Sequence, residues 1–136
     1  MDIDELIENF SFFENWEEKY QYVIDLGRRL EPLDEAFKTE QWLVKGCQSQ
    51  VWLVPQFKPD CIHFCGDSDA LLVKGIIAIV FTIYNDKPAD EIKKVDVQKI
   101  FAKLGLEENL TPSRRNGMMS MIEKIKQYAQ NAEPAD

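Results

Sequence analysis

Histidine, cysteine and long apolar runs are scarce in this chain, and each scarcity excludes a class of protein. The 136 residues include one histidine and three cysteines. A single histidine leaves most zinc sites and catalytic triads without a ligand or a base. An odd number of cysteines does not form a disulfide framework. The longest apolar stretch, 70–84, is interrupted by Lys74 and Gly75, and it is shorter than the about 20 residues that a membrane helix needs.

The common catalytic motifs are missing as well. The sequence has no phosphate-binding loop, no dinucleotide-binding glycine pattern, no nucleophile elbow, no pair of CxxC motifs and no HExxH. Any chemistry must therefore depend on a less common arrangement.

Basic residues are in the minority, with 16 Lys and Arg against 24 Asp and Glu and a net charge of −8. A protein that binds nucleic acid or an anionic membrane needs a clustered basic surface, so we expect neither partner. The acidic excess lies in residues 1–40, which hold 12 acidic and 4 basic residues. We interpret it as a solvated helical face. A docking face for a basic partner is the alternative.

The acidic start of the chain, MDIDE, is unlike the basic start of a signal peptide. We therefore expect a cytoplasmic protein with reduced thiols. At about 150 residues per domain, the length predicts one domain. We place that domain at residues 1–130, with a flexible tail at 131–136.

The hydrophobic pattern predicts an α+β fold. Apolar residues at helical spacing predict helices near residues 3–10 and 16–30, the second with Asn15 as its N-cap. Alternating residues then predict antiparallel strands at 50–57 and 61–65. Further helices are expected at 69–84, capped by Asp67 or Ser68, after Pro88, between Asp96 and Gly105, and from Pro112 to about Tyr128. Helices would thus pack on one side of a small antiparallel sheet, in the order α-α-β-β-α-α-α. Pro55 places the first strand at an edge and gives no clear dimer signal, so a monomer and a homodimer both stay open.

Cys47 is the candidate reactive residue. It lies in a polar loop, between Gly46 and Gln48 and two residues after Lys45, rather than on an apolar face. A nearby cation favours the thiolate, which is the nucleophilic form of cysteine. An inert small residue at a loop-to-strand junction is the alternative. We also expect the Cys47 loop to fold against apolar neighbours in the free protein, either Trp52 or the face of the last helix that carries Met118 and Met121.

A second group, Cys61-x-His63-x-Cys65, resembles a metal site at first sight. On a strand, Cys61 and Cys65 would be about 13 Å apart, because each residue advances about 3.4 Å. Two thiolates on one zinc ion must lie within about 4 Å of each other, so the strand cannot direct all three side chains to one ion. Two alternatives stay open: a metal site that combines His63 with Cys47, and a cysteine hydrolase in which His63 is the base for Cys47.

Arg114 and Arg115 lie in the first turn of the last predicted helix, where the helix dipole disfavours cations. A locally unfavourable choice is a signal of function, although pairing with Glu107 or Glu108 would also account for it. Asp69 follows Gly66-Asp67-Ser68 at the start of the predicted core helix, where acidic residues stabilise the helix end.

Four sequence blocks resemble the SufE family of sulfur-acceptor proteins over about Leu6–Tyr128. They occur in order as NWEEKY from Asn15, GCQSQVW from Gly46, GDSDA with VKG from Gly66, and LTPSR from Leu110. The resemblance implies a SufE/IscU-like fold, a helix-packed antiparallel sheet. It also implies that Cys47 accepts sulfur as a persulfide, and that Asp69 and Arg114 lie near the partner-binding end.

By the same resemblance, the donor is a SufS-type cysteine desulfurase, which this protein would stimulate, and the recipient is a SufBCD-type scaffold for iron–sulfur clusters. The pyridoxal phosphate belongs to the desulfurase, so no cofactor or metal is implied for this chain. It would be an accessory protein with a reactive cysteine rather than an enzyme. The paralogous CsdE branch, which serves a different desulfurase, is the alternative, and the residues Gln48-Ser49-Gln50 favour the SufE branch.

Overall fold

The structure is a computed structural model that describes residues 2–132, apart from the side chain of Glu107. Two helices come first, α1 (Ile3–Ser11) and α2 (Trp16–Gly27). Two short 3-10 turns follow, η1 (Glu35–Phe37) and η2 (Glu40–Trp42), and then strands β1 (Val51–Phe57) and β2 (Ile62–Ser68). The remaining helices are α3 (Leu71–Tyr84), α4 (Ala89–Lys94), α5 (Val97–Leu104), α6 (Leu106–Asn109) and α7 (Pro112–Asn131). The predicted α+β class is confirmed.

Side-chain caps set several helix ends where the sequence places them. The Asn15 side chain accepts a hydrogen bond from the Glu18 amide at 2.9 Å, and Asp96 accepts one from the Lys99 amide at 3.3 Å. Thr111 caps α7 in the same way, with Pro112 behind it. Gly105 ends α5 with a left-handed φ of 69°, a conformation that glycine adopts without a steric penalty.

The sheet is a single antiparallel hairpin in the described residues, and it is longer than predicted. Val51 pairs with Ser68, and Phe57 pairs with Ile62 at the turn end. The expectation that Asp67 or Ser68 caps the following helix is wrong. Gly66, Asp67 and Ser68 belong to β2 because their backbones pair with β1, and α3 begins only at Leu71 without a side-chain cap.

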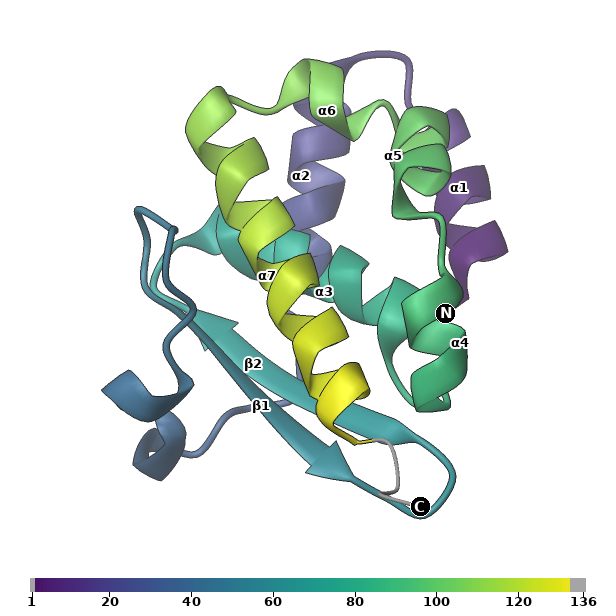
Figure 1. The fold of residues 1–136 in the computed structure, drawn as a ribbon. Coiled ribbons are helices and arrows are strands. Elements are labelled where there is room, and N and C mark those ends of the chain that lie inside the picture. Colours follow the sequence, from purple (N-terminus) through teal and green to yellow (C-terminus); the bar gives the residue numbers. More distant parts are fainter. Residues whose placement is uncertain (1, 133–136) are drawn as a thin grey trace.

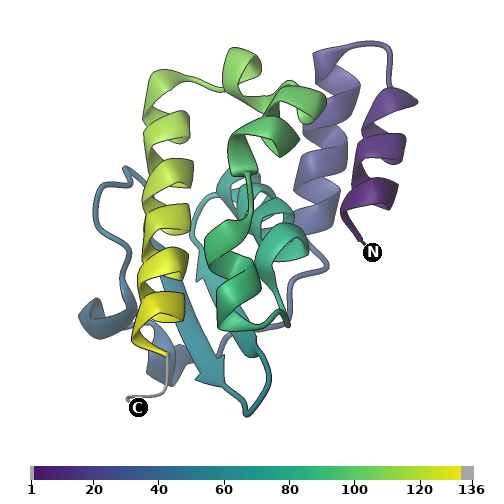
Figure 2. The ribbon, with the colours of Figure 1, turned by 45° about the vertical axis from the view of Figure 1, so that its right-hand side comes forward.

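Helices cover one face of the hairpin and a smaller apolar cluster covers the other (Figures 1 and 2). Helix α3 crosses between the hairpin and α2, and α7 runs over the same face of the sheet. Alternate β2 residues, such as Ile62 and Phe64, point into this main core. On the opposite face, Trp52 and Val54 pack against residues of the 3-10 turns and their flanks.

None of the described helices is long and apolar enough to cross a membrane. Asn131 is the last residue of α7, and residues 133–136 of the predicted tail lie outside the described residues.

The crossing of α2 over α3 depends on two glycines. A Cβ atom on Gly75 would lie 2.1 Å from the carbonyl oxygen of Val23, and one on Gly27 would lie 2.6 Å from the amide nitrogen of Gly75. Neither backbone can yield without separating the helices, so only glycine permits this approach.

We predict that Gly75→Ala destabilises the protein by about 2 kcal/mol or more. Alanine favours helix by about 1 kcal/mol, but overpacking at a rigid contact costs about 1–3 kcal/mol and forces α2 away from α3. Urea denaturation of the variant would measure the loss, with Gln98→Ala on the exposed side of α5 as the control. An unchanged midpoint for Gly75→Ala would contradict the crossing.

Candidate functional site

The loop that carries Cys47 lies against the first half of α7, just before β1 (Figure 1). Gly46 has a φ of +94°, in the left-handed region that favours glycine, and a Cβ there would lie 2.7 Å from the hydroxyl oxygen of Ser120. The chain therefore turns at Gly46 with its backbone close to α7, and the turn directs Cys47 toward the helix.

The thiol of Cys47 is partly buried against Gly117, in the second turn of α7. It donates a long hydrogen bond to the Gly117 carbonyl, with a sulfur–oxygen distance of 3.6 Å. A Cβ on Gly117 would lie 3.3 Å from this sulfur, so the glycine provides the space that the thiol occupies. The expected packing against α7 is thus observed, whereas Trp52 belongs to the cluster on the opposite face of the hairpin.

A cavity of about 360 Å³ opens beside the thiol. Its apolar wall comes from α3 and α7, and its polar rim from the Cys47 loop and the start of α7. The lining residues besides Cys47 are Val73, Ile76, Gly117 and Met121 on the wall, and Gln48, Ser49, Thr111, Ser113 and Arg114 on the rim. The cavity has room for one additional sulfur atom on Cys47 and keeps one side of it apolar.

Burial raises the pKa of the Cys47 thiol above its ordinary value. The expectation that Lys45 favours the thiolate is therefore wrong for this conformation. Lys45 is exposed, and loss of water around the sulfur outweighs any influence of the lysine. The thiol is protonated at neutral pH while the loop is closed.

Asp69 and Arg114 lie on either side of the Cys47 loop. The Asp69 carboxylate accepts a hydrogen bond from the Gln50 amide at 3.1 Å, and the Asp69 amide donates to the Gln50 carbonyl at 3.4 Å. Asp69 thus fastens the end of the loop to the start of α3. Arg114 lines the cavity beside Cys47, and no carboxylate among the described residues forms an ion pair with it.

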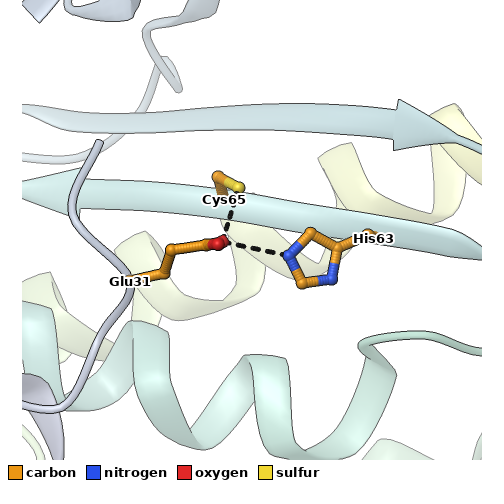
Figure 3. Close-up of side chains that lie close together, drawn as sticks. All are labelled: Glu31, His63 and Cys65. Carbon is orange, nitrogen blue, oxygen red and sulfur yellow. Dashed lines mark hydrogen bonds and ion pairs between the residues drawn. The ribbon is translucent and has the colours of Figure 1, made fainter. Parts of the chain in front are cut away.

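His63 lies far from Cys47. It pairs with Gln56, five residues along β1 from Val51, which is about 17 Å along the strand. Its ring nitrogens contact Asp86, at 2.8 Å, and Glu31, at 3.1 Å (Figure 3). The structure therefore does not bring His63 and Cys47 together, either as a catalytic pair or as metal ligands.

Cys61 and Cys65 also occupy different surroundings. Cys61 lines a surface cavity with Pro59 and Pro88, whereas the Cys65 thiol donates to Glu31 at 3.0 Å. Burial and then the Glu31 carboxylate raise the pKa of the Cys65 thiol to about 12. As expected, Cys61, His63 and Cys65 do not converge on one point.

Sequence reasoning missed Gly117, Glu31 and Asp86. An isolated glycine in a helical pattern signals a close contact, so Gly117 could have been found. Glu31 and Asp86 are distant in sequence from the residues that they contact, and nothing in the local pattern marks them.

Comparison with known proteins gives a consistent assignment. The SufE family, described as an Fe-S metabolism associated domain, matches residues 4–129. An uncharacterised SufE-like protein of Rhizobium meliloti (strain 1021) is 43% identical over 137 residues, covering 98% of both chains. One of Rhizobium etli is 45% identical over 131 residues, covering 93% of this chain and 88% of the relative.

A solution structure titled as a hypothetical protein from Thermus thermophilus has the same fold, with a TM-score of 0.77 at 17% identity over 96% of this chain and 94% of that one. The chain thus has the fold and the cysteine loop of a sulfur-transfer accessory domain. It belongs to the SufE family, whose members act with cysteine desulfurases in iron–sulfur metabolism and are generally not enzymes themselves.

We predict slow alkylation of Cys47 at neutral pH. Only the thiolate reacts, and burial raises the pKa of this thiol, so the rate with iodoacetamide should increase with pH to a midpoint above that of an exposed cysteine. The double variant Cys61→Ser, Cys65→Ser leaves Cys47 as the single thiol for this measurement, and the urea-unfolded variant supplies the reference. A midpoint below that of the unfolded chain would contradict the closed loop.

We also predict that Asp69→Ala makes Cys47 more reactive. The substitution removes the acceptor for the Gln50 amide. A hydrogen bond contributes about 1 kcal/mol, which corresponds to an about fivefold larger open population. Alkylation of Cys47 in the same background would report it. Asp69→Asn is the matched control because its side-chain oxygen can still accept from the amide, and equal rates in both variants would contradict the role of this bond.

Proposed function

We propose that this protein carries persulfide sulfur from a cysteine desulfurase of the SufS type to an iron–sulfur scaffold of the SufBCD type, in the cytoplasm. The observation that carries the proposal is the position of Cys47 at the mouth of a half-apolar cavity, next to Arg114, on the loop that the family resemblance marks. One nucleophilic cysteine is sufficient for this reaction. It requires no cofactor or metal from this chain.

The transfer follows the rules of thiol–disulfide exchange. The Cys47 thiolate attacks the terminal sulfur of the persulfide on the desulfurase, and a new sulfur–sulfur bond forms at Cys47. The donor's sulfur–sulfur bond breaks, and its electron pair leaves with the donor's cysteine thiolate. The Cys47 proton leaves when the thiolate forms, so the step involves no external oxidant or reductant. It stimulates the desulfurase because it restores the donor's free cysteine.

The closed loop requires an opening step. Cys47 is partly buried and protonated in the resting protein, so it must move into water or toward a cation before it attacks. The contacts that hold the loop are few: the hydrogen bonds of Asp69 with Gln50 and the contact of the thiol with Gly117. We propose that desulfurase docking releases them, and that the cavity afterwards shields the persulfide from other thiols.

Asp69 and Arg114 have different proposed roles in docking. Asp69 is exposed and fastens the loop, so a partner that engages its carboxylate would release the Gln50 amide. Arg114 offers a guanidinium beside the sulfur, where it would favour the thiolate as the loop opens and contact the acidic groups of a partner.

Intact-mass analysis after incubation with a SufS-type desulfurase and free cysteine tests the acceptor. We expect one added, reducible sulfur atom on the native chain and on the Cys61→Ser, Cys65→Ser variant, and none on Cys47→Ser. Full loading of Cys47→Ser would overturn the assignment of the site. A parallel incubation with the desulfurase that serves the CsdE branch identifies the donor, since the proposal requires faster loading from the SufS type.

We predict that Arg114→Ala slows this loading at least several-fold without unfolding the protein. The substitution removes a cation from the rim of the cavity, and the thiolate and the persulfide are both anionic. Arg115→Ala is the matched control because Arg115 is not part of the cavity lining. Equal loading rates for both variants would contradict the role of Arg114.

A further inference from the structure

A second group of reactive side chains lies on the other face of the hairpin, away from the Cys47 cavity (Figure 3). His63 and Cys65 are two residues apart on β2, and so they point to the same side of the strand. Glu31, from the segment after α2, lies against both of them. One Glu31 oxygen, Oε1, is 3.0 Å from the Cys65 sulfur and 3.1 Å from His63 Nε2.

We propose that Glu31, His63 and Cys65 form a binding site for a divalent transition metal, with Zn²⁺ as the best fit. The three ligand atoms all lie within 4.8 Å of one another. Zinc ligands at bond lengths of about 2.0–2.3 Å are about 3.4–3.6 Å apart in a tetrahedron. The Glu31 side chain is 61% exposed, so it can shift by the few tenths of an ångström that separate the hydrogen-bonded arrangement from the coordinating one.

The donor set selects the class of metal. One thiolate, one imidazole and one carboxylate match zinc and its close neighbours, whereas Ca²⁺ and Mg²⁺ prefer oxygen ligands alone. The Cys65 thiol loses its proton to solvent when the metal binds. The ion's two positive charges are then balanced by one thiolate and one carboxylate. Three protein ligands leave a fourth position for water or for a ligand from a partner.

Asp86 supplies the support that a metal-binding histidine needs. Its carboxylate lies 2.8 Å from His63 Nδ1, which leaves Nε2 directed at Glu31. A carboxylate on the outer nitrogen fixes the tautomer and the orientation of a zinc-bound imidazole. Asp86 is itself held in place, with a φ of 59° and its amide donating to the Ile62 carbonyl at 2.9 Å.

The charges around the group also point to a cation. Asp67 is the next residue on the same face of β2, and it forms ion pairs with Lys38 at 3.1 Å and Lys74 at 3.4 Å. Glu31 and Asp86, in contrast, share His63 as their ion-pair partner within the described part of the chain. Two carboxylates on one imidazole leave an excess of negative charge that a divalent ion would neutralise.

Titration with Co²⁺ and competition with Zn²⁺ test the site in the reduced, metal-free protein. We expect Co²⁺ to give a thiolate-to-metal charge-transfer band and the visible bands of a tetrahedral site, and Zn²⁺ to abolish both. Cys65→Ser should lose the charge-transfer band. Cys61→Ser and Cys47→Ser, as matched controls, should keep it, and this separates the metal site from the sulfur-acceptor function.

Two further variants test the geometry. Glu31→Gln should weaken metal binding at least tenfold without unfolding the protein, because its side chain is largely exposed. Asp86→Asn should weaken it about 10–100-fold, since asparagine tolerates a positive φ but does not carry the charge. Far-UV circular dichroism checks that each variant is folded. Absence of the charge-transfer band from the native protein, or its persistence in Cys65→Ser, would overturn the proposal.

Discussion

A hairpin of two strands is at best marginally stable alone in water, and this constraint governs the whole molecule. The chain satisfies it by packing helices on one face of β1 and β2 and a small apolar cluster on the other. Helix α3 is the central element, since most of its residues are buried and it contacts both α2 and the hairpin. The glycines at its crossing with α2 allow this close packing, and so they determine where the hairpin lies.

The positions of both reactive cysteines follow from this hairpin. Cys47 precedes β1 and lies at the end where Val51 pairs with Ser68, under the first half of α7. Cys65 lies within β2, on the face turned away from α3 and α7. The sheet thus separates the two thiols, and each cysteine takes its chemical character from a different set of neighbours.

The local pattern of the sequence predicted the helices and their caps, because those signals lie within a few residues of one another. Asn15, Asp96, Thr111 and Gly105 all act as expected. The start of α3 was wrong because Gly66–Ser68 can cap a helix or continue a strand, and only pairing with β1, far back in the chain, decides between them. The environment of Cys47 was predicted in part: its contact with α7 was expected, but the pKa was not, because burial by Gly117 and the cavity depends on tertiary packing.

Glu31 was beyond prediction for the same reason, since 34 residues separate it from Cys65. Its carboxylate gives the two cysteines different reactivities. A sulfur acceptor needs a thiolate, and a carboxylate in direct contact disfavours the thiolate of Cys65, whereas Cys47 faces a cavity with an arginine on its rim. Opening the loop relieves the burial that protonates Cys47, but no such movement of Cys65 removes the negative charges of Glu31 and Asp86 around it. Under the proposed function, this difference in electrostatics directs the incoming sulfur to Cys47 even though the chain contains three free thiols.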